Sequence, residues 1–391
     1  MRSNLSKPRV LVVSPIPLQP AIRGNRRRAN QLAEAFRSAG WHVELAIARN
    51  DAKAAAKVGS WDRIHPLSSP LPWKPSARPA KFDSWYSKAA GEEVAKIAQA
   101  QDFHAVVLHY VFHSKLFEII PPHIIKIIDT HDCFAERATL GASKSAFRSR
   151  GFFSCDKLDE KAYLDRADFA IAISEDDAKQ FRKLGSSAEV RVVPMAFGDV
   201  DVGPSAREIS SNPTFGVAMS GNDVNVTSLL DFVKQVDSVA GANPDFRVAV
   251  AGDIIKRLKP PLMRSHRLGS RPWLTFLGVV PDIADFYRSL DGIIVPLNEA
   301  TGVSVKFVEA IQSGLPVLST RSGSRGTGAR EPLHTLPSNR ELVLALGQWS
   351  SRTAAELSKQ SVTLSVELQN ASQEAFLALN RDLLNGAYGD D

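Results

Sequence analysis

Apolar positions along this chain occur in two patterns, as short uninterrupted runs and as longer stretches with an apolar residue every three or four positions. Uninterrupted runs predict strands that are covered on both faces, and the wider spacing predicts helices packed on them. In the first half, strands are predicted at 9–17, 41–49, 105–112, 124–132, 169–174 and 190–195, and helices at 30–40, 159–167 and 175–185. This alternation predicts an α/β domain with a parallel sheet.

The pattern stops at residues 199–213, where polar residues, glycine and proline gather, and then starts again. In the second half, strands are predicted at 214–221, 246–253, 274–280, 292–297 and 316–321, and helices at 227–241, 283–290, 303–314, 340–349 and 374–384. We therefore predict two facing, doubly wound, Rossmann-like domains. The predicted parts are an N-terminal domain at 1–200, a linker at 201–213, a C-terminal domain at 214–370, and a helix and tail at 371–391 that cross back to the N-terminal domain.

Residues 59–87 depart from this alternation, because they combine several prolines with three tryptophans and scattered basic residues. A proline-rich surface loop is the simpler interpretation. The functional alternative is a loop that contacts the acceptor or a membrane, since tryptophan and basic side chains suit the bilayer interface.

Composition and charge narrow the class of protein. The apolar runs are too short to cross a bilayer, and the run near the start is too short for a secretory signal. Cys133 and Cys155 lack metal-ligand spacing, so we expect neither a disulfide framework nor a metal site, and a cytoplasmic location. The net charge is +6 with the basic excess in the first half, which suits an anionic partner such as a lipid pyrophosphate or the inner face of the cell membrane. Nucleic acid is not expected.

The clearest chemical signal lies at 291–320, where a strand is followed by a glycine, a helix and a second strand. The first amides of a helix have no intrahelical partner and form an anion site, so Gly302, Val303 and Ser304 are predicted to receive a diphosphate. Lys306 is placed to reach a phosphate, and Glu309 to accept hydrogen bonds from the two hydroxyls of a ribose.

This block resembles the donor site of the group 1 (family 4) glycosyltransferases, which are retaining enzymes with the GT-B fold. The resemblance continues through most of the chain, and His131 with Asp132 is similar to the His-Asp pair that these enzymes place at a strand end. Further positions that resemble the family's donor-binding loops are Gly24, Gly221, Asn222, Asn225, Gly252 and Gly278.

Two departures from the family pattern concern the diphosphate. Thr301 stands where many members have the first of two glutamates, the second being Glu309 here. The stretch 220–229 has no Arg or Lys where many members have both. The resemblance therefore assigns Thr301 to donor binding only, and neutralisation of the diphosphate to Lys306 with the helix dipole.

The resemblance implies transfer with retention. The sequence itself favours transfer without a metal or other cofactor, since it has no HExxH motif. His131 would then contact the donor sugar, Asp132 would be a candidate orienting group, and Glu309 and Lys306 would complete the catalytic set. Arg26, Arg27 and Arg28 fit either a solvated helix face or a site for an acceptor phosphate, and we assign Arg26 and Arg27 to the acceptor. His109 and His113 are expected to be structural.

The leading interpretation is a transferase that moves a hexose-type sugar from a nucleotide sugar to a glycan or lipid-linked acceptor of a surface polysaccharide or glycolipid. A nucleotide-sugar epimerase is one alternative, although no convergent set of carboxylates for proton abstraction is evident. A non-catalytic protein that binds sugar nucleotides or glycans is another, because of Thr301.

Overall fold

The computed structural model describes the chain in eight stretches. They are 7–21, 23–58, 61–72, 80–135, 154–196, 211–258, 260–300 and 302–388. By its internal contacts the chain divides into two compact units. Unit 1 holds the described residues of 1–142, 150–195 and 370–391, and unit 2 holds those of 196–369.

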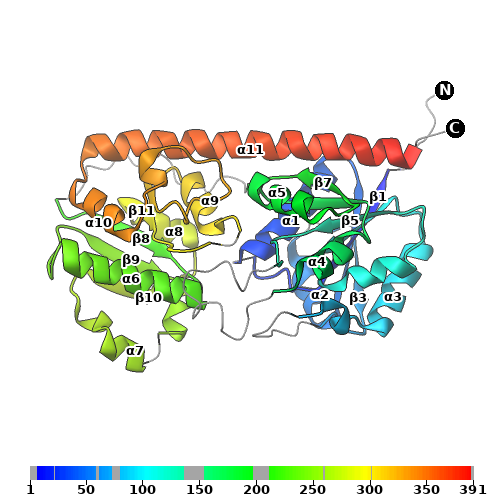
Figure 1. Cartoon of the computed structure of the whole chain (residues 1–391), viewed down its shortest axis with the longest axis horizontal. Coiled ribbons are helices and arrows are strands. Elements are labelled where there is room, and N and C mark those ends of the chain that lie inside the picture. The colour runs from blue at the N-terminus through cyan, green and yellow to red at the C-terminus, as the bar shows by residue number, and fades with distance from the viewer. Residues whose placement is uncertain are drawn as a thin grey trace. The chain divides into compact units, whose positions relative to one another are not determined.

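Unit 1 contains a parallel sheet in the order β3-β2-β1-β4-β5-β6-β7 (Figure 1). Its strands are β1 (Arg9–Ser14), β2 (His42–Ala48), β3 (Arg63–Leu67), β4 (Ala105–His109), β5 (Ile125–Asp129), β6 (Phe169–Ala172) and β7 (Glu189–Val192). All five residues of β4, a central strand, are buried. Its uninterrupted apolar sequence AVVLH is therefore explained by cover on both faces.

Helices connect these strands and pack on the sheet. They are α1 (Gly24–Ser38), α2 (Arg49–Ala55), α3 (Lys88–Gln99), α4 (Lys157–Leu164) and α5 (Glu175–Leu184), with the short 3-10 helices η1 (Ala56–Val58), η2 (Phe82–Trp85) and η3 (Val111–Ile119). The ends of α5 follow from its sequence. The Ser174 hydroxyl accepts a hydrogen bond from the Asp177 amide at the start, and Gly185 ends the helix in the left-handed region at φ 69°.

Two details of unit 1 differ from the sequence-based prediction. Residues 59–87 are not only a surface loop, because 63–67 form the edge strand β3 and Phe82 and Trp85 are buried in the core. The buried Trp85 is not available to a membrane. In addition, α1 begins at Gly24, so the residue that was expected in a loop is the first of a helix.

Unit 2 contains a second parallel sheet in the order β10-β9-β8-β11-β12. Its strands are β8 (Thr214–Ala218), β9 (Arg247–Ala251), β10 (Leu274–Gly278), β11 (Gly292–Val295) and β12 (Val317–Ser319). Its helices are α6 (Asp223–Val239), α7 (Pro260–Ser265), α8 (Ile283–Arg288), α9 (Val305–Gln312) and α10 (Asn339–Gly347), with the 3-10 helices η6 (Asp253–Lys256), η7 (Leu268–Ser270) and η8 (Pro332–His334). The prediction of two α/β domains with parallel sheets is confirmed.

The last helix, α11 (Ser351–Tyr388), contributes to both units, since residues up to 369 belong to unit 2 and later ones to unit 1. In unit 1 it buries Phe376, Leu379 and Leu383 in the core. None of the helices in the described part of the chain combines the length and the apolar character needed to cross a membrane.

Candidate functional site

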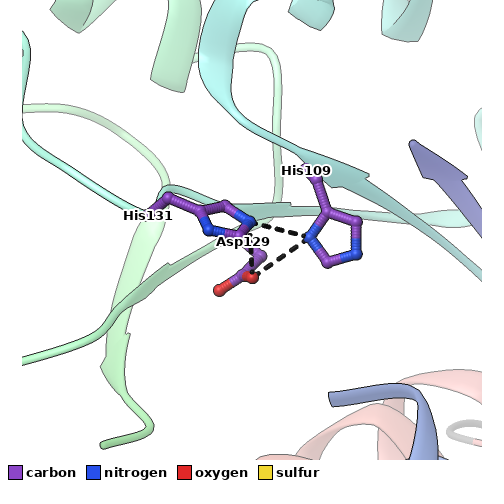
Figure 2. A group of neighbouring side chains, drawn as sticks. All are labelled: His109, Asp129 and His131. Atoms are coloured by element: carbon purple, nitrogen blue, oxygen red, sulfur yellow. Dashed lines mark hydrogen bonds and ion pairs between the residues drawn. The ribbon is translucent and has the colours of Figure 1, made fainter. Parts of the chain in front are cut away.

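Polar side chains gather in unit 1 where the neighbouring strands β4 and β5 end. His109 is the last residue of β4, Asp129 is the last residue of β5, and the two are paired in register. His131 follows two residues later. The rings of both histidines converge on the Asp129 carboxylate (Figure 2), and all three residues are buried. Parallel pairing therefore brings together residues that are far apart in the sequence.

The three side chains form a tight triangle. His109 Nδ1 and His131 Nε2 each lie 3.1 Å from Asp129 Oδ2, and these two ring nitrogens are also 3.1 Å from each other. His109 Nδ1 is hydrogen-bonded to the shared carboxylate oxygen, and His131 Nε2 lies within ion-pair distance of the same oxygen. The Asp129 carboxylate therefore orients both histidines.

Arg28 completes this group from α1. Its guanidinium is fully buried, and Nη2 and Nε donate to Asp129 Oδ1 at 3.1 and 3.2 Å. Nη1 donates to the Pro194 carbonyl at 3.3 Å. The prediction that placed Arg28 on a solvated helix face or in an acceptor site is wrong, because the side chain is the counter-ion of a buried carboxylate.

Burial and charge determine the protonation states of this cluster. Burial alone would raise the pKa of Asp129, but the Arg28 guanidinium and the two histidines hold it well below its usual value. Burial lowers the pKa of His131 to about 3, and the Asp129 charge only partly opposes that shift. At neutral pH the carboxylate is therefore ionised and the His131 ring is neutral.

The backbone around His131 is held in an uncommon conformation. Tyr110 and His131 both adopt left-handed backbone angles, with φ 67° and 60°, which cost energy for residues other than glycine. Their rings stack with centroids 4.2 Å apart and planes 11° apart. The Tyr110 hydroxyl accepts a hydrogen bond from Asn25 Nδ2 in the first turn of α1 at 2.9 Å. These contacts fix the orientation of the His131 ring.

The triangle also has the composition of a metal site. His109, Asp129 and His131 offer one ligand atom each, all within 4.8 Å of one another. The guanidinium of Arg28 already occupies the same carboxylate and would repel a second cation. The arrangement therefore suits a neutral, positioned imidazole better than a divalent ion.

The segment after His131 and Asp132 is held by a buried carboxylate from α4. Glu160 accepts hydrogen bonds from the amides of Phe134 at 2.8 Å and Ala135 at 2.5 Å, and from the thiol of Cys133 at 3.3 Å. Burial raises the pKa of Glu160 to about 7, although these hydrogen bonds lower it. This carboxyl group therefore titrates near neutral pH.

In unit 2, four predicted donor-binding glycines lie at or beyond the carboxyl ends of the strands. Gly221 follows β8, Gly252 follows β9, Gly278 ends β10 and Gly302 follows β11. Gly252 has φ 110°, and a Cβ atom there would approach the Met219 carbonyl oxygen within 2.1 Å. The structure thus places these loops along one edge of the sheet, as Rossmann-like ligand sites require.

The two predicted asparagines make structural contacts at the start of α6. Asn222 caps the helix, since its side chain accepts from the Asn225 amide at 2.8 Å. Asn225 is buried and donates from Nδ2 to the Ser220 carbonyl at 2.7 Å. These bonds shape the loop after β8.

The opening of α9 has the features of an anion site. Ser304 precedes the helix and is 6% exposed, and its buried hydroxyl oxygen has no hydrogen-bond partner among the described residues. Lys306 is half-buried in the first turn, and burial lowers its pKa while the charge of Glu309 opposes the shift. A buried hydroxyl beside the unpaired amides of a helix start is suited to phosphate oxygens.

The structure brings together some of the predicted residues and adds others. His131 lies in the unit 1 cluster, but the carboxylate on its ring is Asp129 rather than Asp132. His109, which was expected to be structural, belongs to this cluster. Arg26 donates to the carbonyls of Gln19 and Pro20 at 2.9 and 3.1 Å.

Three predicted positions remain without further assignment. Thr301 lies outside the described residues. Arg27 is half-buried in α1, and Val303 is half-buried just before α9. The members of the unit 1 cluster that the sequence-based prediction did not assign to a site are Arg28, His109, Tyr110 and Asp129.

Comparison with known proteins gives two family matches. Residues 23–196 match the model described as "Glycosyl transferase 4-like domain", and residues 214–341 match the model described as "Glycosyl transferases group 1". Together the two matches span most of the chain. A search of curated protein sequences found no match.

Several solved structures share the fold of this chain. Sucrose-phosphate synthase from Thermosynechococcus elongatus matches with a TM-score of 0.73 and 17% identity, over 97% of this chain and 99% of that one. HepE from Anabaena in complex with UDP matches with a TM-score of 0.66 and 13% identity, over 95% and 100%. A glycosyltransferase from Rickettsia africae matches with a TM-score of 0.65 and 14% identity, over 99% and 100%. The fold is therefore GT-B, as predicted.

The buried ion pair predicts a large loss of stability when its acid is neutralised. Replacing Asp129 by asparagine leaves the Arg28 guanidinium buried without its counter-charge, so we expect the free energy of unfolding to fall by about 3–5 kcal/mol in urea titrations. As a control, Lys88→Ala breaks an exposed pair with Glu92 and should change it by less than about 1 kcal/mol. Similar small effects for both variants would contradict this assignment.

The raised pKa of Glu160 predicts a pH-dependent stability. The folded protein keeps this carboxyl protonated up to about pH 7, whereas the unfolded chain ionises at its ordinary value of 4.5. The stabilisation is complete below pH 4.5 and is lost as the pH rises to 7, a change of roughly 3 kcal/mol. The free energy of unfolding of the wild-type protein minus that of Glu160→Gln should fall between pH 4.5 and 7. The same difference taken against Glu34→Gln, a change at an exposed residue, should not vary with pH. A level difference for both variants would disprove the role of Glu160.

Proposed function

Because the chain belongs to the group 1 glycosyltransferases, we propose that it transfers a hexose-type sugar from a nucleoside-diphosphate sugar to a glycan or lipid-linked acceptor. The observation that carries the proposal is the opening of α9, where the buried Ser304 hydroxyl lacks a described partner and Lys306 lies in the first turn. HepE, which shares the fold, was solved with UDP and with UDP-glucose. That likeness supports a nucleotide sugar as the donor.

The proposed roles in unit 2 follow from charge. When the bond between the anomeric carbon and the diphosphate breaks, negative charge develops on the diphosphate and positive charge on the sugar. The α9 amides, the Ser304 hydroxyl and the Lys306 ammonium stabilise the departing diphosphate. Glu309, three residues further along α9, accepts hydrogen bonds from the ribose hydroxyls.

The proposed roles in unit 1 concern the sugar and the acceptor. The neutral His131 ring, with Nε2 directed at the Asp129 carboxylate, can accept a hydrogen bond from a sugar hydroxyl at Nδ1, and its orientation is held by Asp129 and Tyr110. Arg26 and Arg27 at the start of α1 are proposed to hold an acceptor phosphate.

Transfer is proposed to proceed with retention and without a metal. The acceptor oxygen forms the new bond to the anomeric carbon on the face that the diphosphate leaves, and its proton passes to a departing phosphate oxygen. The basic first half fits an acceptor at the inner face of the cell membrane, in the assembly of a surface polysaccharide or glycolipid.

A thermal-shift screen against UDP, GDP and ADP tests the donor site. One of them should raise the melting temperature of the wild-type protein, because a ligand that binds the folded state stabilises it. Lys306→Ala and Glu309→Ala should lose most of that rise, whereas the exposed Lys359→Ala on α11 should keep it. A full rise in all three variants would place the nucleotide elsewhere.

Turnover tests the proposed reaction. Incubation with nucleotide sugars and a lipid-linked or glycan acceptor in excess EDTA should release nucleoside diphosphate only when the acceptor is present, at the same rate as without chelator. NMR of the product should show the anomeric configuration of the donor. Release without acceptor, loss of activity in EDTA, or inversion would each refute the corresponding part of the proposal.

A further inference from the structure

The loop that follows β12 is attached to the segment that opens the proposed diphosphate site. Ser322 Oγ donates to the Asn298 carbonyl at 2.8 Å, and Arg325 Nη1 donates to the Ala300 carbonyl at 2.6 Å. Asn298 and Ala300 lie on the path from β11 to Ser304 at the start of α9. The Arg325 guanidinium therefore sits beside the residues that lead into the helix.

The segment around the opening of α9 and the loop after β8 supply few cations. Between 296 and 312 the only cationic side chain is Lys306, whereas Glu299 and Glu309 are both acidic. The loop after β8, 220–229, adds no cation of its own, and its Asp223 is paired with Arg257. A diphosphate carries at least two negative charges, which a single ammonium does not balance.

Arg325 is able to bind a phosphate while it keeps its hydrogen bond to the Ala300 carbonyl. A guanidinium has five N–H donors in a fixed fork. One of them bonds to the Ala300 carbonyl, and the structure shows no further hydrogen bond from this side chain to any described residue. Arg325 is half-buried, so its charge is screened less by water than that of an exposed arginine.

We propose that Arg325 is the second cation of the diphosphate site, binding a phosphate oxygen of the nucleotide sugar opposite the amides and hydroxyl at the start of α9. The inference rests on the proposed function and adds to it a residue from the loop after β12. Arginine suits this position because it combines a permanent charge with several donors for phosphate oxygens.

Matched variants separate the effect of the Arg325 charge from the effect of its hydrogen bond to the Ala300 carbonyl. Arg325→Gln removes the charge but keeps an amide donor for the Ala300 carbonyl, whereas Arg325→Lys keeps the charge. Arg330→Gln is the control, since Arg330 is exposed near the end of the same loop. The melting temperature of each variant without ligand shows that it is folded.

The measurement is the dissociation constant, by titration calorimetry, for whichever of UDP, GDP or ADP stabilises the wild-type protein. Arg325→Gln should bind it about ten- to a hundredfold more weakly, as expected for the loss of a charged hydrogen-bond partner. Arg325→Lys should recover most of the affinity, and Arg330→Gln should match the wild type.

Two results would overturn the inference while the proposed function stands. One is wild-type affinity in Arg325→Gln, and the other is equal weakening in Arg325→Gln and Arg325→Lys, which would indicate a role in loop structure alone. If the wild-type protein bound none of the three nucleotides, the proposed function itself would fail and the inference with it. The wild-type titration is therefore the first to be run.

Discussion

Parallel strand pairing is the constraint on which both candidate sites depend. In a sheet whose strands all run the same way, every carboxyl end lies at one edge, and the loops that follow are brought together there. In unit 1 this places His109 beside Asp129, although the two residues are separated by a whole strand connection. In unit 2 it aligns the loops after β8, β9, β10 and β11. The chemistry of each unit follows from which polar residues terminate its strands.

The two edges use charge in opposite ways. In unit 1 the Arg28 guanidinium and the Asp129 carboxylate neutralise each other in the protein interior, and burial keeps the His131 ring neutral. The cluster therefore has little net charge, and it is suited to holding a side chain in one orientation. In unit 2 the proposed diphosphate site combines the helix amides at the start of α9 with two cations, Lys306 and Arg325. We propose that this set receives a ligand that brings its own negative charge.

The features that could be predicted from sequence are those that depend on local pattern. The uninterrupted apolar runs located β4 and β5 because buried strands need apolar side chains on both faces. The edge strand β3 was missed, since it contains Pro66 and exposed positions, and an edge strand carries a weaker apolar signal. Partners across the fold were also missed. Arg28 resembles its neighbours Arg26 and Arg27 in sequence, and only the tertiary structure shows that one of the three is buried against Asp129.

The division of α11 between the two units has a consequence for how the protein is made. Trp41 Nε1 donates to Asn380 Oδ1 at 2.6 Å, a contact between residues 339 positions apart, and Arg191 pairs with Asp382. A ribosome synthesises residues 370–388 after all the strands of both units. The N-terminal sheet therefore emerges first but acquires this part of its core last, when the nascent chain is nearly complete. Until then, the apolar surface that Phe376 and Leu379 cover is open to chaperones and to other nascent chains.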